Sequence, residues 1–152
     1  MPTEKIEPDI LADPAQIVEE CYRLISFGPG EAPQWKRFRQ LFSPKAVLAL
    51  RVFPEDPSVT IMTMDEYMVH QMRKGMKETG YTETVLDRHV RRFADIAEAR
   101  VDFEMRFGDG DPVRALDVFQ LARREGRWWI VSVVSDMLRQ AETARRCRPN
   151  ET

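Results

Sequence analysis

The sequence predicts an α+β protein, in which helices come first and a sheet of long antiparallel strands follows. In the first third of the chain, apolar residues recur at helical spacing, most clearly between residues 14 and 27. From Tyr81 onward they recur at every second position, which is the period of a β-strand. Helices that precede a run of strands, instead of alternating with them, are typical of the α+β class.

The first predicted helix begins after Asp13, a favoured N-cap residue, with Pro14 at its first position. Glycines and a proline at 28–30 end it. A shorter helix is expected over residues 33–42. Residues 1–12, which precede the first helix, are expected to form a flexible arm.

Two short strands, at residues 46–53 and 59–62, separate these helices from a third. Thr63 and Glu66 have the spacing of a capping box, which predicts a helix that begins there and runs to about Thr79. Methionines recur at every fourth position of this helix and would form a stripe along one side. They either supply an adaptable wall to a pocket or simply pack in the core. They are Met64, Met68, Met72 and Met76.

Four long strands follow, at residues 81–94, 96–107, 113–123 and 127–135. The second alternates most regularly, with apolar residues at odd positions from Ala97 to Phe107 and charged residues between them. The last strand, around which we expect the sheet to be built, is apolar on both faces, which is typical of a strand covered on both sides. Strict alternation puts Trp128, Ile130 and Val134 on one face and Trp129, Val131 and Val133 on the other.

Length and composition exclude several classes of protein. A chain of 152 residues fits one domain, expected at 13–136, with a charged C-terminal tail at 137–152. The net charge of −2 comes without a clustered basic face, so we expect no nucleic-acid partner. No apolar run is long enough for a membrane span, and the N-terminus lacks the apolar core of a signal peptide, so we expect a cytoplasmic protein. Cys21 and Cys147 have no metal-binding spacing, and we expect neither a metal nor a cofactor.

Several short phrases in the sequence resemble the nuclear transport factor 2-like superfamily, which includes the SnoaL-like proteins, ketosteroid isomerase and scytalone dehydratase. They are similar to those of an uncharacterised branch, and the order of elements matches over about residues 12–136. The phrases are Trp35–Phe42, Arg92-Phe93, Ile96-Ala97, Phe119-Gln120-Leu121 and Arg127-Trp128-Trp129-Ile130-Val131-Ser132.

This resemblance implies a cystatin-like cone, in which a curved antiparallel (mixed) sheet wraps around three N-terminal helices. It also implies a pocket inside the cone and a homodimer formed through the sheet, with one tryptophan of the last strand facing the helices and the other facing the partner. The residues expected to line the pocket are Trp35, Phe38, Tyr67, Met68, Met72, Val101, Phe103 and Phe119.

Three residues are candidates for catalysis in such a pocket. Tyr22 matches the place of the oxyanion-hole tyrosine in ketosteroid isomerase-like proteins, and is otherwise a core tyrosine. Asp117 shares an apolar face with Phe119, where burial would raise its pKa. Its role is catalysis, a hydrogen bond within the structure or to a ligand, or neither if it is exposed. His89 is expected on the same face as Glu83 of its strand, or else on the surface. The isomerase's general base is missing, because no carboxylate lies near Leu50.

These observations support two hypotheses of function. In the first, the apolar pocket binds a hydrophobic small molecule and, if the protein is an enzyme, transforms it as a lyase or isomerase by acid–base chemistry. In the second, the protein is a non-catalytic homodimeric interaction or scaffold module whose cone is filled by its own side chains.

Overall fold

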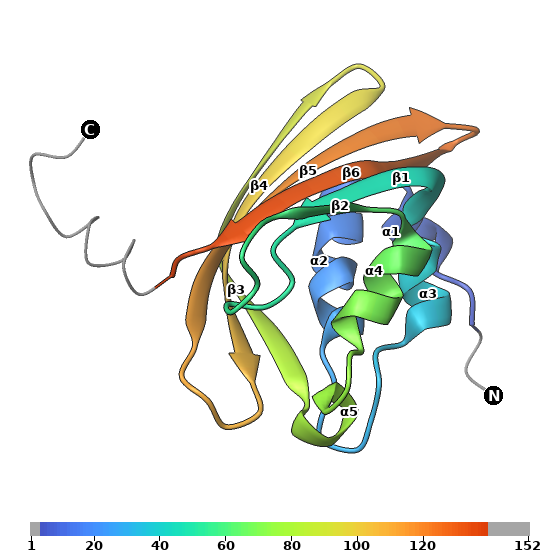
Figure 1. Ribbon diagram of the computed structural model, residues 1–152. Helices are drawn as coiled ribbons and strands as arrows, with labels where there is room; N and C mark the ends of the chain where they lie inside the picture. Colours follow the sequence, from blue (N-terminus) through green and yellow to red (C-terminus); the bar gives the residue numbers. More distant parts are fainter. Residues whose placement is uncertain (1–3, 140–152) are drawn as a thin grey trace, which may run out of the picture.

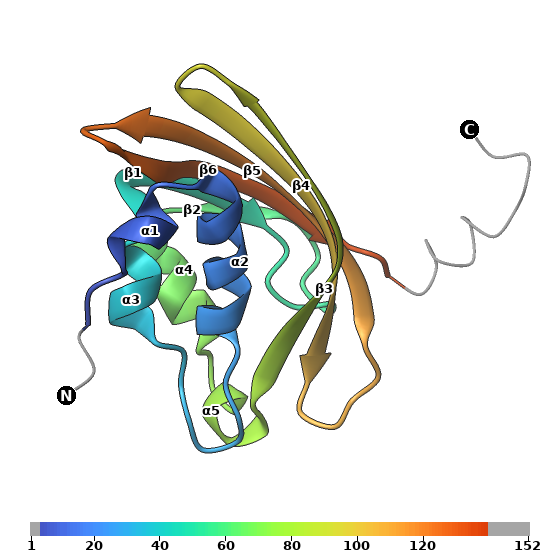
Figure 2. The ribbon, with the colours of Figure 1, turned by 180° about the vertical axis from the view of Figure 1, so that it is seen from behind.

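The computed structural model describes residues 4–139, and it confirms the α+β class. The sheet has six strands in the order β2-β1-β6-β5-β4-β3, and all neighbours are antiparallel except β1 and β6, which are parallel. Figures 1 and 2 show that the sheet curves around the helices, which all lie on its concave side. The elements are α1 (Pro8–Leu11), α2 (Pro14–Ile25), α3 (Trp35–Arg39), β1 (Phe42–Leu50), β2 (Thr60–Met62), α4 (Met64–Gln71), α5 (Met76–Thr79), β3 (Tyr81–Phe93), β4 (Ile96–Phe107), β5 (Val113–Arg124) and β6 (Arg127–Met137).

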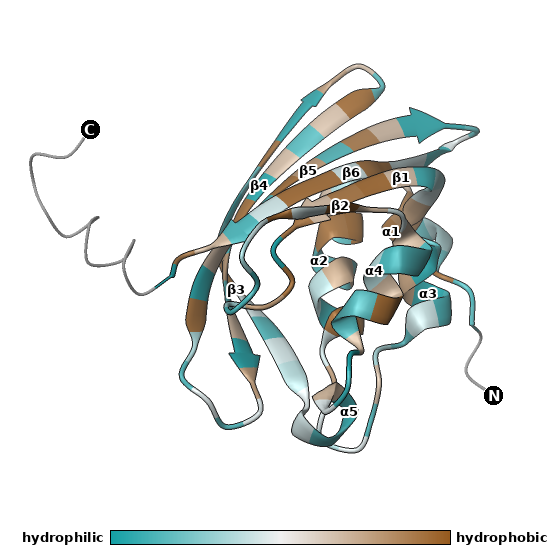
Figure 3. Ribbon diagram, viewed as in Figure 1, coloured by the Kyte–Doolittle hydropathy of each residue, from teal (hydrophilic) through white to brown (hydrophobic). Residues whose placement is uncertain are grey.

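The core lies between α2 and the concave face of the sheet. Ile17 and Leu24 of α2 are completely buried, and so are Trp128 and Ile130 of β6. In Figure 3 the strongest hydrophobic colouring lies on α2 and on the central parts of β1 and β6 that cover it. Trp128 is therefore the tryptophan of this strand that faces the helices. None of the helices within residues 4–139 is long and apolar enough to cross a membrane.

A β-bulge in β6 changes which side chains enter the core. The pairing with β5 passes from Ile130–Leu121 to Ser132–Gln120, so Val131 is an extra residue. One extra residue reverses the faces of everything that follows it. Val133 is buried, whereas Val134 is 55% exposed on the outer face. The prediction from strict alternation, which put Val134 beside Trp128, is therefore wrong for the second half of the strand.

A second bulge interrupts β3. Its pairing with β4 passes from Val85–Phe103 to Asp87–Asp102, which leaves Leu86 as the extra residue. Side chains beyond Leu86 lie on the face opposite to the one that alternation predicts. Bulges also increase the local bend of a strand, which suits a sheet that curls around a helix.

The N-terminal half departs from the prediction in two places. The sequence predicts no element before Asp13, whereas the structure has α1 there, and Ile6 is buried with its N–H donating to Gln40 Oε1 at 3.1 Å. The helix predicted from Thr63 to Thr79 is two helices, because Gly75 adopts a left-handed φ of +96° between them. The break divides the methionine stripe, of which only Met76 is buried.

The bounds predicted for the domain, 13 and 136, fall at the start of α2 and one residue before the end of β6, and Ile6, which precedes them, also packs in the core. Residues 1–3 of the expected arm and 140–152 of the expected charged tail lie outside the described residues, and so does Cys147.

Candidate functional site

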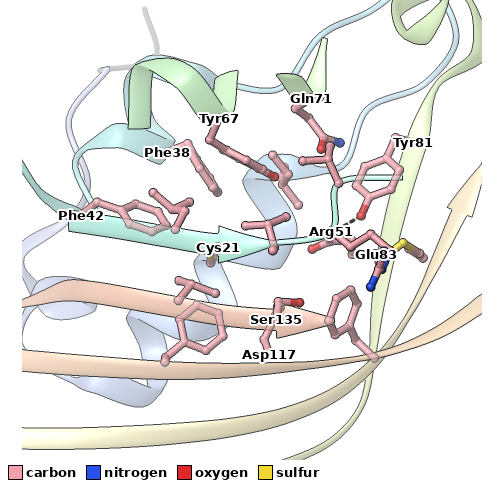
Figure 4. Close-up of a pocket in the computed structure, with 18 residues that line it drawn as sticks. Cys21, Phe38, Phe42, Arg51, Tyr67, Gln71, Tyr81, Glu83, Asp117 and Ser135 are labelled. Atoms are coloured by element: carbon pink, nitrogen blue, oxygen red, sulfur yellow. Dashed lines mark hydrogen bonds between the residues drawn. The ribbon is translucent and has the colours of Figure 1, made fainter. Parts of the chain in front are cut away.

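A cavity of about 50 Å³ opens inside the cone, bounded by α2, α3, α4 and five strands of the sheet. About 10–15 Å³ is enough for one water molecule, so the cavity has room for a few waters or a small ligand. Its walls are mainly apolar, with polar side chains gathered from several elements. The polar lining residues are Arg51, Tyr67, Gln71, Tyr81, Glu83, Asp117 and Ser135, labelled in Figure 4.

Asp117 lies on the inner face of β5, where the sequence places it, and is only 8% exposed. The Tyr22 hydroxyl of α2 donates a hydrogen bond to Asp117 Oδ2 at 2.7 Å, and the Ser135 side chain of β6 also hydrogen-bonds to this carboxyl. Burial raises the pKa of Asp117 to about 6, although the bonds from Ser135 and Tyr22 act to lower it. Asp117 therefore changes charge close to neutral pH.

Glu83 of β3 is a second carboxyl in the same cavity, and the Tyr81 hydroxyl donates a hydrogen bond to its Oε2. The backbone of Glu83 is fixed by its N–H, which donates to Ser26 Oγ at 3.0 Å. Burial, and then the negative charge of Asp117, raise the pKa of Glu83 to about 8, while the Tyr81 hydrogen bond acts to lower it.

The two carboxyls interact, so the pair loses its protons in two steps, near pH 6 and near pH 8. Between these two values the pair holds one proton, so one carboxyl can accept a proton while the other donates one. Two titratable groups whose environments separate their pKa values are the usual basis of an acid and a base in one site. The arrangement can therefore move a proton onto and off a molecule held between them.

Tyr22 does not line the cavity, because its ring packs against Phe103 and Phe119 and its hydroxyl is engaged by Asp117. Burial raises the pKa of Tyr22 far above the physiological range, so it remains a neutral donor. The geometry makes Tyr22 a residue that orients Asp117. The resemblance had implied a donor to the ligand itself.

His89 does not join the other two candidates. The bulge at Leu86 puts it on the outer face of the sheet, where its side chain is 70% exposed and its Nε2 lies 3.2 Å from Asp87 Oδ2. The prediction that His89 shares a face with Glu83 is wrong for this reason, and the surface position given as the alternative is the one that the structure shows. Tyr81 and Glu83 are the residues of β3 that line the cavity.

Four of the eight residues expected to line the pocket do so, namely Phe38, Tyr67, Phe103 and Phe119. Trp35 packs edge-on against Phe38 and Tyr67 instead, with ring centroids 5.5 and 6.2 Å away. Val101 is completely buried in the sheet, and neither Met68 nor Met72 lines the cavity.

Arg51 lines the cavity beside Leu50, near the place where the isomerase's general base was sought. Its guanidinium is held from outside the cavity, because Nε donates to Asp136 Oδ1 at 3.0 Å and an Nη donates to the Asp56 carbonyl at 2.7 Å. The charge of Arg51 is therefore paired with Asp136, and its side chain forms part of the cavity wall. Within residues 4–139, no group of three histidine, cysteine or acidic side chains could hold a metal ion.

No protein-family model and no curated protein matches the sequence. Solved structures do match the fold. An NTF2-like protein of unknown function from Pseudomonas putida is 12% identical, with a TM-score of 0.64 over 86% of this chain and 88% of that one. An NTF2-like protein with a cystatin-like fold from Novosphingobium aromaticivorans is 14% identical, with a TM-score of 0.63 over 86% and 83%. A third, from Shewanella baltica, is 19% identical, with a TM-score of 0.54 over 82% and 93%. The fold is therefore the cystatin-like fold of the nuclear transport factor 2-like (NTF2-like) proteins, as the sequence phrases implied.

Proposed function

We propose that the protein binds a small, mainly apolar molecule in the cavity and transfers a proton to or from it, as an isomerase or a lyase. The observation that carries this proposal is the pair of carboxyls, Asp117 and Glu83, in one mainly apolar cavity with an acid and a base form available at pH 7. Apolar walls supply binding and strengthen electrostatic interactions within the site.

The proton balance of such a reaction is simple. Asp117, as the carboxylate, removes a proton from a carbon atom of the ligand. Glu83, as the acid, gives a proton to a second atom of the ligand, which yields an isomer, or to a departing oxygen, which yields an unsaturated product and water. The opposite charge states of the pair are restored by exchange of protons with solvent.

Binding is tested by thermal unfolding in the presence of mainly apolar molecules of about five to ten heavy atoms, each with one polar group. A ligand at 100 times its Kd stabilises the folded state by about 2.7 kcal/mol, which raises Tm by several degrees. Val133 lines the cavity and Val134 points outward, so they form a matched pair. Val133→Phe should fill the cavity and abolish the shift in Tm, whereas Val134→Phe should keep it. A shift that survives in Val133→Phe would place the ligand elsewhere.

The small volume of the cavity also favours a second candidate, a non-catalytic homodimeric module with a nearly filled cone. The outer face of the sheet carries an apolar row that crosses four strands, and Val134 and Ile61 in it are 55% and 75% exposed. We take the second copy of this chain as the partner, because both signs of charge lie next to the row: Arg100 pairs with Val118, and Asp102 follows Arg100 on the same face of β4. A two-fold axis can then bring opposite charges together. The row consists of Val118, Val134, Ala49 and Ile61.

Val134→Glu is expected to convert a dimer into a monomer, because two carboxylates would be buried at the centre of the interface. Val69→Glu is the control, since Val69 is 74% exposed on α4, away from the sheet. Light scattering measures the mass of each variant. A dimer that persists in Val134→Glu would show that another surface forms it, and a monomeric wild type would remove the dimer altogether.

A further inference from the structure

The cavity is closed along most of its wall. Among its lining residues within 4–139, Leu50, Arg51 and Glu83 are half-buried and the others are buried. Leu50 ends β1 and Arg51 follows it, whereas Glu83 lies near the start of β3. The least covered part of the cavity therefore lies between the end of β1 and the start of β3. We call this gap, between Arg51 and Glu83 in Figure 4, the mouth.

The connection between β1 and β2, residues 51–59, crosses this mouth. Val52 lines the cavity, and the next residue, Phe53, packs against Phe107 of β4 with ring centroids 5.5 Å apart. Phe107 pairs with Tyr81, the first residue of β3. In both Figure 1 and Figure 2 the connection extends from β1 and β2 toward β3. It therefore covers the cavity on the side where the sheet leaves it open.

Asp56 holds the connection in place through both its side chain and its backbone. Its carboxylate accepts two hydrogen bonds from Arg73, one to each oxygen and both 2.9 Å long, and a third from the Phe53 N–H at 3.2 Å. Its carbonyl accepts a bond of 2.7 Å from Arg51, whose Nε donates to Asp136 of β6. The Arg73 guanidinium also lies 3.7 Å from the centre of the Phe53 ring. Asp56 therefore joins the connection to the segment after α4 and to one side of the mouth.

Two features of the closed arrangement favour opening. The side chains of the Asp56–Arg73 pair are 19% and 37% exposed, so water can replace their hydrogen bonds at a modest cost in free energy. Gln71, which lines the cavity two residues before Arg73, is 2% exposed, and its Nε2 has no hydrogen-bond partner among residues 4–139. A buried donor without a partner raises the free energy of the closed form, and water that enters through an open mouth would pair with it.

We propose that residues 51–59 form a lid that opens to admit small molecules to the cavity, and that the ion pair between Asp56 and Arg73 is the latch that holds it shut. The ladder of β1 and β2 ends with the pair Leu50–Thr60, so the lid can move while both strands stay in place. A local opening of this kind needs less free energy than unfolding of the whole domain. The inference does not depend on the chemistry of the molecule that enters.

Cys21 reports whether the mouth is open, because it lines the cavity and is only 8% exposed. The probe is methyl methanethiosulfonate, a small reagent that attaches a methylthio group to a thiol, and mass spectrometry follows the reaction. The parent protein for these measurements carries Cys147→Ser, so that Cys21 is its only thiol. Asp56→Asn keeps the shape of the side chain and removes its charge. Labelling of Cys21 should become about tenfold faster, because the weakened latch increases the open population.

The dependence of the labelling rate on urea separates an opening lid from unfolding. Opening of a short segment exposes little surface, so the rate in Asp56→Asn should be nearly constant at urea concentrations below the unfolding transition. A rate that rises with urea as steeply as the unfolded fraction would show that Asp56→Asn acts by destabilising the whole fold. That result would overturn the lid.

Asp95→Asn is the matched control, because it removes the charge of another arginine–aspartate pair, with Arg123, at the other end of β3. Its labelling rate should equal that of the parent. Arg73→Gln should speed labelling as Asp56→Asn does, and the double variant should add little, because both changes break the same pair. The inference is overturned if Asp56→Asn keeps the parent rate, if Asp95→Asn speeds labelling equally, or if the two latch changes are fully additive. It is also overturned if Cys21 of the parent reacts as fast as it does in the urea-unfolded chain, because the mouth would then have no closed state.

Discussion

Replacing Asp117 with asparagine is expected to lower kcat/KM by about 10²–10⁴-fold, the usual contribution of a general base. Asparagine keeps the shape of the side chain and an oxygen that accepts the Tyr22 hydrogen bond, but it cannot take a proton at neutral pH. The assay is exchange, in D₂O, of the carbon-bound protons of a ligand found by thermal unfolding. Asp95→Asn is the control, since the Asp95 side chain is 66% exposed between β3 and β4, pairs with Arg123 and does not line the cavity. An unchanged rate in Asp117→Asn would remove Asp117 from the mechanism.

The same reaction should have a bell-shaped dependence on pH. Activity is lost below about pH 6, where Asp117 gains a proton, and above about pH 8, where Glu83 loses one. Ser135→Ala removes a hydrogen bond that lowers the pKa of Asp117, so the acidic limb should move to higher pH. Movement to lower pH would contradict the role of Ser135.

Glu83→Gln is expected to make the folded state more stable at pH 8 and to reduce the loss of stability with rising pH. Between about pH 4.5 and 8 the folded protein keeps a proton on Glu83 that the unfolded chain has released, so stability falls as pH rises across this interval. At about 1.4 kcal/mol for each pH unit, the free energy of unfolding would fall by about 5 kcal/mol at most across this interval. The loss is expected to be smaller, because Glu83 is only partly buried and solvent screens its charge. The amide oxygen of the substituted side chain would still accept the Tyr81 hydrogen bond. Because burial also raises the pKa of Asp117, the stability of the variant should still fall with rising pH, by a smaller amount and at lower pH.

Urea unfolding at several pH values measures this effect. Glu98→Gln is the control, because the Glu98 side chain is 58% exposed on the outer face, and its pH dependence should match that of the wild type. If Glu83→Gln and the wild type have parallel curves, the Glu83 carboxyl has an ordinary pKa and cannot serve as the acid.

The sheet was predictable because alternation is a local property of the chain. The strand predicted at 96–107 has those bounds in the structure. Asp117 points inward because it is two residues from Phe119, and side chains two residues apart on a strand share a face. Each bulge adds one residue to one strand, and nothing in the local composition distinguishes Leu86 or Val131 from its neighbours. The positions of His89 and Val134 therefore could not be obtained from the pattern.

The site was harder to predict than the fold, because it is made by residues far apart in the sequence. Glu83 alternates with apolar residues of β3 at inward positions, which was the available indication of its burial. Gln71 follows Tyr67 by four residues on one helix, but an unpaired donor becomes visible only when its surroundings are known. Gly75 was an indication of the break between α4 and α5, and the continuous methionine spacing around it favoured the wrong interpretation.

The central claim is that two carboxyls share one cavity with pKa values on either side of neutral. Nuclear magnetic resonance of the carboxyl carbons of Asp117 and Glu83, followed from pH 3 to pH 10, tests it directly. Two ionisation steps near pH 6 and pH 8 are predicted, both seen at each of the two carbons because the groups interact. Ionisation of both groups near pH 4, as in an unfolded chain, would contradict the account.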